Sequence, residues 1–170
     1  MKVNILKLNK NAIIPFKTYS SDFCYDVVAV SEEEVAPNVW RYGLGIAMQI
    51  ERGEEKVLKI NDAFIENYVT INMLKSPLNL SLDFRPRSSI WKTGMSLANK
   101  ETATGDESYT GEYMLVFYHL MTDMPRYKVG DKIAQMKIGI TFPIEFNEVT
   151  KLTNTKRGSN GFGSTGQSSN

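Results

Sequence analysis

Arginine, proline and serine fall together at the end of a run of alternating apolar and polar residues. The run at 78–84 is followed by Arg85-Pro86-Arg87-Ser88-Ser89. Proline cannot donate to a neighbouring strand, so a strand should stop at Pro86. Beyond it, a guanidinium, two hydroxyl groups and free backbone N–H groups could face one space, a combination that binds phosphate oxygens. The alternative is an ordinary turn, which is what a strand end with serines usually forms.

An acidic segment, GDESYTGE at 105–112, is the second candidate for chemistry. An aspartate beside a glycine most often belongs to a solvated turn. Asp106 would instead be a general base for water if it points into a pocket.

The tail 156–170 is dense in glycine and serine, and this composition alone predicts a mobile terminus. Arg157 and Phe162 have no evident use in a solvated tail, but they suit a segment that closes over an aromatic, anionic ligand. A ring stacked on a base contributes about 1–3 kcal/mol. The stretch 161–166 is not a P-loop, because the required lysine is missing and no helix can follow. Its glycines still permit close backbone approach to phosphates.

For three other candidates, the surrounding sequence favours a structural role over a chemical one. His119 is the single histidine, which excludes a site made of several histidines. Cys24 stands between Phe23 and Tyr25, an apolar setting that favours packing over nucleophilic chemistry. The acidic run 32–34 is expected to be a solvated loop.

The elements that must position these residues are mainly strands. Period-two alternation of apolar and polar residues occurs at 3–8, 44–50, 78–84, 113–118 and 132–140. Short runs of this kind, separated by turn residues, predict an all-β sandwich or barrel. One short helix is plausible at 62–68, and the sequence contains no internal repeat.

Composition narrows the function classes. The chain has 170 residues, a length that fits one domain, and 20 Lys+Arg against 19 Asp+Glu give a formal net charge of +1. This balance argues against a general nucleic-acid binder. One cysteine allows no intrachain disulfide, and no apolar run reaches the roughly 18 residues of a membrane span. We therefore expect a soluble, cytoplasmic protein that contacts neither membrane nor nucleic acid.

Taken in order, five segments resemble the five motifs of the trimeric dUTPases. They are 22–29, 86–89 followed by Gly94, 105–112, 130–136 and 157–166. The resemblance implies an all-β, dUTPase-like distorted jelly roll or β-barrel over 1–155, with an insert around 51–77 and a flexible Gly-rich C-terminal arm, 156–170. It also implies a homotrimer with active sites between subunits, in which each arm reaches over a neighbour's site.

The resemblance further implies hydrolysis of dUTP to dUMP and pyrophosphate. Asp106 would activate the water that attacks the α-phosphorus, and Tyr109 would pack on the deoxyribose and exclude a 2′-hydroxyl. Asp26 would help to hold Mg²⁺ through water, because Mg²⁺ keeps much of its hydration shell. The triphosphate would contact Arg87, Ser88, Ser89 and Gln135. The arm would contribute Phe162 on the uracil, with Arg157, Gly163, Ser164 and Thr165 over the phosphates.

The base would be read by a hairpin around Leu97–Thr104, with Asn99 as one possible contact. Thr104 and Gly105 precede the catalytic aspartate and belong to the nucleoside pocket. Two rival functions stay open. A dCTP deaminase shares the fold, but the position of its catalytic glutamate is occupied here by Val116, which cannot transfer protons. A dUTPase-fold protein could also act by nucleotide-switched binding of a regulatory partner. The insert 51–77 would then be a partner-binding surface instead of a surface hairpin or short helix.

Overall fold

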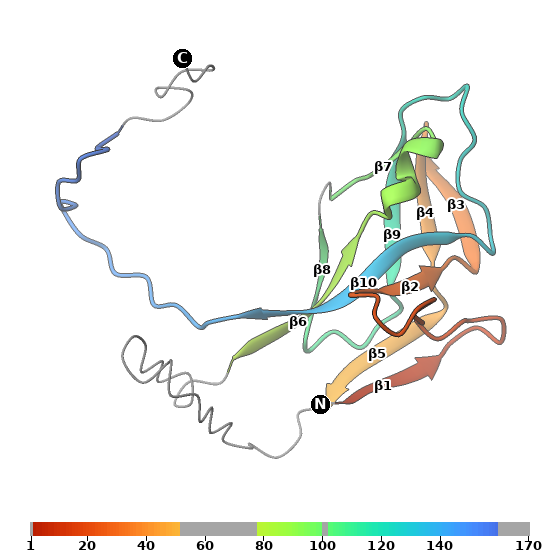
Figure 1. Ribbon diagram of the computed structural model, residues 1–170, viewed down its shortest axis with the longest axis horizontal. Helices are drawn as coiled ribbons and strands as arrows, with labels where there is room; N and C mark the ends of the chain where they lie inside the picture. The colour runs from red at the N-terminus through yellow and green to blue at the C-terminus, as the bar shows by residue number, and fades with distance from the viewer. Residues whose placement is uncertain (1, 52–77, 100–101, 160–170) are drawn as a thin grey trace.

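The computed structural model describes residues 2–51, 78–99 and 102–159, and these form an antiparallel β structure (Figure 1). Its elements in chain order are β1 (Lys2–Lys7), β2 (Tyr25–Val28), β3 (Ser31–Ala36), β4 (Val39–Gly43), β5 (Ile46–Glu51), β6 (Asn79–Arg85), the 3₁₀ turn η1 (Ser88–Lys92), β7 (Met95–Leu97), β8 (Ala103–Asp106), β9 (Met114–His119) and β10 (Lys132–Thr141). The all-β prediction is confirmed, and the five predicted strands correspond to β1, β5, β6, β9 and β10. The helix expected at 62–68 lies outside the described residues. No helix within the described ranges has the length and apolar character needed to cross a membrane.

Two four-stranded sheets enclose the core. The first has the strand order β2-β10-β6-β8 and the second β3-β4-β9-β7, while β1 and β5 form an antiparallel pair. Alternate residues of β6, Leu80, Leu82 and Phe84, are buried between the layers, as period-two burial requires. Phe117 and Tyr42 of the second sheet complete the centre, with their rings edge to face at 5.7 Å.

The other face of the first sheet is polar. Antiparallel partners point to the same side of a sheet, so the register defines this face in three rows. The rows are Asp26–Gln135–Arg85, Lys137–Asp83–Thr104 and Gly139–Ser81–Asp106. Asp26, Gln135, Thr104 and Asp106, which sequence analysis selected on β2, β10 and β8, therefore lie on one surface, which we call the polar face, whereas Gly105 pairs with the buried Leu82 and lies on the opposite face.

Two local predictions are wrong. The acidic run 32–34 is not a loop but part of β3, which pairs with β4 through a two-residue turn. Pro37 and Asn38 form that turn, and Asn38 adopts the positive φ of 60° that asparagine tolerates. The base-reading hairpin expected at 97–104 is also not formed by its flanking strands, because β7 pairs with β9 and β8 pairs with β6. The strands on either side of this segment, β7 and β8, belong to different sheets.

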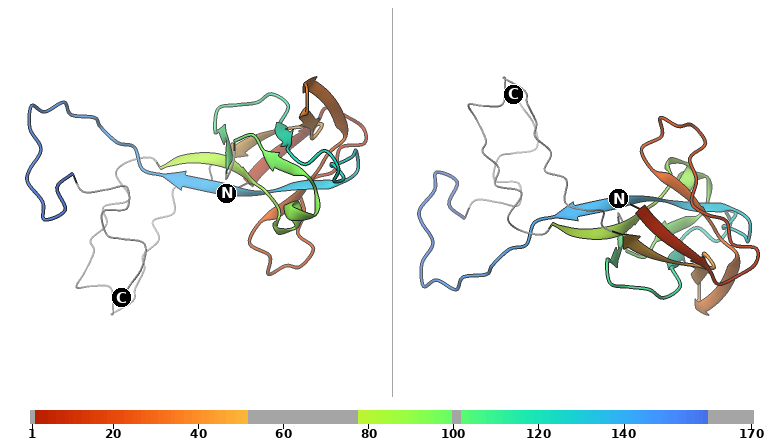
Figure 2. Two further views of the ribbon diagram at one scale, coloured as in Figure 1. Left: turned by 90° about the horizontal axis from the view of Figure 1, so that it is seen from above. Right: turned by 90° about the horizontal axis from the view of Figure 1, so that it is seen from below.

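The chain leaves the sheets after β10. Residues 142–159 lead away from the β layers in all views (Figures 1 and 2). They carry large apolar side chains in exposed positions: Phe142, Ile144, Phe146, Val149 and Leu152. A stretch of exposed apolar side chains of this kind is characteristic of a segment that binds a partner.

Candidate active site

The turn after β6 has the structure that Pro86 predicts. The strand ends at Arg85, and η1 follows with hydrogen bonds from Ile90 N to Arg87 O (3.0 Å) and from Thr93 N to Ile90 O (2.9 Å). Gly94 closes the turn against the loop after β9, and its carbonyl oxygen accepts hydrogen bonds from the amides of Leu120 (2.7 Å) and Met121 (3.1 Å). A Cβ on Gly94 would lie 2.0 Å from Met121 O, so only glycine allows this approach. The turn that carries Arg87, Ser88 and Ser89 is thus fixed at both ends.

Asp26 is the centre of a cationic cluster at one end of the polar face. Its carboxylate accepts hydrogen bonds from Arg87 Nε (3.2 Å), Lys132 Nζ (2.9 Å) and Gln135 Nε2 (3.3 Å). We call these four residues the Asp26 cluster. Asp26 is 5% exposed, whereas the side chain of Arg87 keeps 28% of its surface accessible. Arg87 and Gln135, which were expected to contact the triphosphate, and Asp26, which was expected to help hold Mg²⁺, are therefore brought together.

The charge state of the cluster follows from these contacts. Burial acts to raise the pKa of Asp26, but the hydrogen bonds from Lys132 and Gln135 and the charge of Arg87 outweigh it. The pKa consequently lies below its ordinary value. Lys132 is itself held by Thr18 Oγ1 at 3.1 Å and lies 4.7 Å from the centre of the Phe16 ring. With two cations and one anion, the cluster carries net positive charge.

A tight turn sets the start of β10 and hence the position of Lys132 and Gln135. Lys128 N donates to Asp131 Oδ2 at 2.7 Å, and Gly130 adopts a φ of 93°, which side chains rarely permit. Gly130 N then donates to Ala29 O (2.9 Å) and Ala29 N to Asp131 O (3.0 Å). This Gly-Asp pair therefore fastens β10 beside β2.

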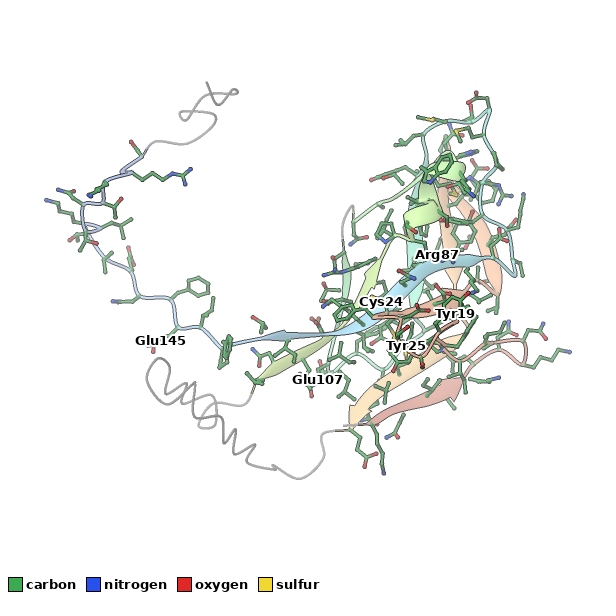
Figure 3. The ribbon with its side chains drawn as sticks, in the orientation of Figure 1. Tyr19, Cys24, Tyr25, Arg87, Glu107 and Glu145 are labelled. Carbon is green, nitrogen blue, oxygen red and sulfur yellow. The ribbon has the colours of Figure 1, made fainter. Side chains whose placement is uncertain are left out.

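Cys24 lies close to this end of the sheet, just before β2 (Figure 3). It is a free, half-buried thiol, and its neighbours Phe23 and Tyr25 are exposed. The apolar setting expected for it is therefore only partly formed. His119 ends β9, and its Nε2 lies 3.1 Å from Met124 O, in keeping with a structural role.

The other candidates lie around a pocket of about 280 Å³ beside β8, which we call the β8 pocket. Its lining includes Thr104, Gly105, Asp106 and Tyr109, together with the apolar side chains of Phe84, Ala103, Met114 and Leu115. Thr104 and Asp106 are exposed, and Asp106 O accepts a hydrogen bond from Tyr109 N (3.0 Å) in the turn that follows β8. Because β8 is the last strand of its sheet, one of its edges is free of strand partners within the described residues.

Aromatic rings form the wall of the β8 pocket. Tyr113 packs edge to face on Tyr109, with ring centres 5.2 Å apart, and lies 5.3 Å from Phe84. A Cβ on Gly105 would be 2.5 Å from the Tyr113 ring, so glycine is needed to admit that ring. Burial raises the pKa of the Tyr113 phenol, and the nearby Tyr109 and Asp106 add to the rise because a phenolate at Tyr113 would be repelled by negative charge on either. The phenol therefore stays neutral and available for hydrogen bonding at physiological pH.

Sequence reasoning missed two residues of this region. Lys132 directly follows the Gly-Asp pair of the fourth motif, and its cationic side chain was the available signal. Glu112 ends the third motif and fastens the loop after β8, because its Oε1 accepts from Gly45 N at 3.0 Å. A side chain on Gly43 would collide with the same carboxylate, at 2.7 Å.

The structure places the Asp26 cluster and the β8 pocket apart on the first sheet, and only Thr104 and Asp106 of the pocket belong to the polar face. Asp106 pairs with Ser81, four residues along β6 from Arg85, which stands in the row of Asp26. This corresponds to roughly 13 Å along the strands and roughly 14 Å across them. In Figure 3, Arg87 and Glu107, the residue after β8, lie apart. The described residues thus present two separate groups of candidate residues, the Asp26 cluster and the β8 pocket.

The remaining predicted residues fall elsewhere. Asn99 is exposed in the turn after β7 and does not line the β8 pocket. Arg157 is exposed on the segment that leads away from the sheets. Phe162, Gly163, Ser164 and Thr165 lie outside the described residues, as do residues 52–77 of the insert predicted around 51–77.

The donors present do not fit a metal held by the protein alone. Among the described residues, no group of three or more His, Cys, Asp or Glu side chains could hold a metal ion. The carboxylate implied as a Mg²⁺ ligand, Asp26, already accepts from two cations and an amide. A divalent cation would meet net positive charge there.

Comparison with known proteins supports the family that the five motifs resemble. Residues 68–166 match the sequence profile of the dUTPase family. A deoxyuridine 5′-triphosphate nucleotidohydrolase of Clostridium novyi is 33% identical over 167 residues, which cover 98% of this chain and 99% of that protein. The chain belongs to the dUTPase family. A second dUTPase relative, from Helicobacter pylori strain P12, is 30% identical over 169 residues, covering 99% of both chains.

Solved structures of the dUTPase family share the fold. The dUTPase of Staphylococcus bacteriophage 80alpha with dUPNHPP gives a TM-score of 0.69 at 19% identity, covering 98% of this chain and 99% of that one. A mutant dUTPase from phage phi11 of S. aureus, described with a structural Mg(II) ion, gives 0.61 at 16% identity, covering 91% and 100%. At these identities the likeness establishes the fold alone, and it agrees with the two packed sheets described above.

Proposed function

We propose that this dUTPase-family protein hydrolyses dUTP to dUMP and pyrophosphate, with Asp106 as the base that activates the attacking water. The observation that carries the proposal is that Asp106, Tyr109 and the free edge of β8 border one pocket. An exposed carboxylate at the mouth of an apolar pocket can hold a water molecule beside a bound ligand.

The β8 pocket supports recognition of a pyrimidine deoxynucleoside. The unpaired backbone N–H and C=O groups of an edge strand can hydrogen-bond the alternating acceptors and donor of uracil. The Tyr109 ring, held by Tyr113 and by its hydroxyl bond to Glu112 O (2.9 Å), would pack on the sugar. A ring fixed in this way leaves no room for a 2′-hydroxyl, which would separate dUTP from UTP.

The phosphates would be bound by Arg87, Ser88, Ser89 and Gln135. A triphosphate is highly anionic, and its hydrolysis depends on alignment and charge neutralisation more than on covalent chemistry. Mg²⁺ would be bound by the substrate phosphates and would neutralise part of their charge. The side chains of the chain itself orient the phosphates and hold the water.

A homotrimer with sites between subunits is part of the proposal. The Asp26 cluster and the β8 pocket of one subunit lie apart, so a complete site would combine the β8 pocket of one subunit with the Asp26 cluster of a neighbour. The exposed apolar residues at 142–152 would be covered by a neighbouring subunit. If residues 142–152 run along a neighbouring subunit, the segment that follows them would reach the neighbour's site with Arg157, Phe162, Gly163, Ser164 and Thr165.

Pyrophosphate release from dUTP, dCTP, dTTP and UTP with Mg²⁺ tests the proposal. Wild type should act on dUTP, and Asp106→Asn should lower kcat by about 10²–10⁴-fold while it still binds a non-hydrolysable dUTP analogue. Asp123→Asn, which removes an exposed carboxylate outside the β8 pocket, is the matched control and should behave as wild type. A folded wild-type protein that releases no pyrophosphate from dUTP would refute the hydrolase function.

Nucleotide-switched binding of a protein partner is the second candidate. It rests on the fold shared with phage 80alpha dUTPase, which is described as controlling transfer of virulence genes by a G protein-like mechanism. The candidate surface, 51–77, lies almost wholly outside the described residues. A pull-down with and without deletion of 51–77, in the presence and absence of dUTP analogue, separates this role from hydrolysis. Deamination of dCTP has less support, because Val116 on β9 offers no proton-transfer group.

A further inference from the structure

The carboxylate of Asp26 has almost all of its hydrogen-bonding capacity in use. An ionised carboxylate offers about four lone-pair positions. Oδ1 accepts from Arg87 Nε (3.2 Å) and Gln135 Nε2 (3.3 Å), and Oδ2 accepts from Lys132 Nζ (2.9 Å). The backbone of Asp26 is fixed as well, since it exchanges hydrogen bonds with Phe16 (2.7 and 3.2 Å). A residue that is 5% exposed and satisfied in this way has little left to offer a metal-bound water.

The charges around Asp26 favour an anion over a cation. Arg87 and Lys132 contribute two positive charges against one carboxylate, whose side chain is 7% exposed while those of Arg87 and Lys132 keep 28% and 32% of their surface. Like charges repel more strongly where water screens them less, so a divalent cation is disfavoured there and a phosphate is favoured.

The same contacts orient the three partners of Asp26. Arg87 directs Nε to Asp26 and Nη1 to Lys132 O at 3.5 Å, which fixes the plane of the guanidinium and leaves Nη2 for a ligand oxygen. Gln135 lies opposite Asp26 in the strand register, and its amide is turned toward the carboxylate. Without the Asp26 carboxylate, Arg87, Lys132 and Gln135 would lose the hydrogen bonds that orient them toward one point.

We propose that Asp26 is a positioning residue, a buried counter-ion that holds Arg87, Lys132 and Gln135 in place for the phosphates, and that it is not a metal ligand. The proposal rests on the proposed binding of a triphosphate. It departs from the Mg²⁺ role that the family resemblance implies for this aspartate. The two roles make opposite statements about magnesium dependence.

The deciding measurement is calorimetric binding of α,β-imido-dUTP in saturating Mg²⁺ and, separately, in EDTA. A positioning role predicts that Asp26→Asn weakens binding about tenfold or more, by the same factor in both conditions. A loss confined to the Mg²⁺ condition would assign the metal to Asp26 and overturn the proposal. Unchanged binding in both conditions would overturn it too. Asp123→Asn, which removes an exposed negative charge remote from the cluster, should change neither value more than twofold.

A second variant covers the case in which Asp26→Asn does not fold. Lys132→Gln keeps the carboxylate and removes the ammonium that occupies Oδ2. A positioning role predicts weaker binding by one common factor in Mg²⁺ and EDTA. A metal-ligand carboxylate, relieved of a competing cation, would bind Mg²⁺ more tightly and lower the Mg²⁺ requirement, which would contradict the proposal.

Inorganic triphosphate separates this inference from the proposed function. Suppose that wild type binds triphosphate in EDTA, that Asp26→Asn weakens this binding, and that wild type does not hydrolyse dUTP. The hydrolase assignment then fails, while the positioning role stands. If wild type hydrolyses dUTP but the Asp26→Asn effect appears only with Mg²⁺, the positioning role fails alone. If wild type binds neither triphosphate nor the nucleotide analogue, both fail.

Discussion

Substitution of Gly94 by alanine tests the reasoning about the phosphate-binding turn. The added Cβ would lie 2.0 Å from Met121 O, and since real Cβ atoms stay at least 3.0 Å from such atoms, the two backbones must separate by about 1 Å. That movement stretches the bonds from Leu120 N (2.7 Å) and Met121 N (3.1 Å) to Gly94 O. Loss of two hydrogen bonds costs about 1–3 kcal/mol, and overpacking adds about 1–3 kcal/mol.

We therefore expect Gly94→Ala to lose about 2–6 kcal/mol of unfolding free energy. With a slope of about 2 kcal/mol per molar urea, the unfolding midpoint should fall by about 1–3 M. The assay is urea unfolding at one fixed protein concentration, followed by tryptophan fluorescence, because Trp91 lies in η1 next to this turn. Gly158→Ala is the control: its methyl meets open space, any adjustment of its backbone stays on the segment outside the sheets, and the midpoint should hardly move.

A Gly94→Ala protein that unfolds at the wild-type midpoint would refute the claim that this contact excludes a side chain. A destabilised variant that binds the dUTP analogue normally would refute the link between the contact and the position of Arg87. The expected functional result is weaker nucleotide binding in the folded fraction, because η1 follows Arg87 directly and ends next to Gly94.

Three further outcomes are expected. Gly105→Ala should lower stability by about 1–3 kcal/mol and weaken dUTP-analogue binding, since its Cβ would lie 2.5 Å from the Tyr113 ring; unchanged melting and binding would contradict this. Gly139→Ala should lower the free energy of unfolding in urea by about 1–3 kcal/mol, because its Cβ would lie 2.5 Å from Asp83 Oδ2. Adding Asp83→Ala to Gly139→Ala should recover part of this loss, and strictly additive effects of the two changes would argue against the contact. The pKa of Asp26 is below that of the unfolded chain, about 3.9, so its contribution to stability is present above that pH and is lost as pH falls through the folded pKa. Urea midpoints measured below about pH 4 should therefore drop less in Asp26→Asn than in wild type, and parallel curves would count against the Asp26 contacts.

The sequence predicts the strands in which apolar and polar residues alternate without interruption. Runs at 78–84 and 132–140 predicted β6 and β10 because each strand buries one face and exposes the other. β3 was missed because its alternation is masked by three glutamates, of which Glu32 is drawn into an ion pair with Arg126 at 3.0 Å. The turn at Pro37-Asn38 was the available signal for the hairpin.

The sequence predicted which residues belong to the candidate site better than it predicted how those residues are arranged in space. Motif order identified Asp26, Arg87 and Gln135, but their convergence depends on the pairing of β2 with β10 across more than a hundred residues. Register between distant strands is set by packing of the whole sheet, and no local pattern encodes it. The same holds for Lys132, whose bond to Asp26 appears only when that register is known.

The separation of the Asp26 cluster from the β8 pocket has a genetic consequence. If each active site takes its base from one subunit and its phosphate cradle from another, then Asp106→Asn and Arg87→Gln damage different halves. Two inactive proteins carrying one change each, unfolded and reassembled together, would regenerate some intact sites in mixed oligomers. In a cell carrying both alleles, the enzymatic activity would then depend on the fraction of oligomers that contain both kinds of subunit, and not on either gene product alone.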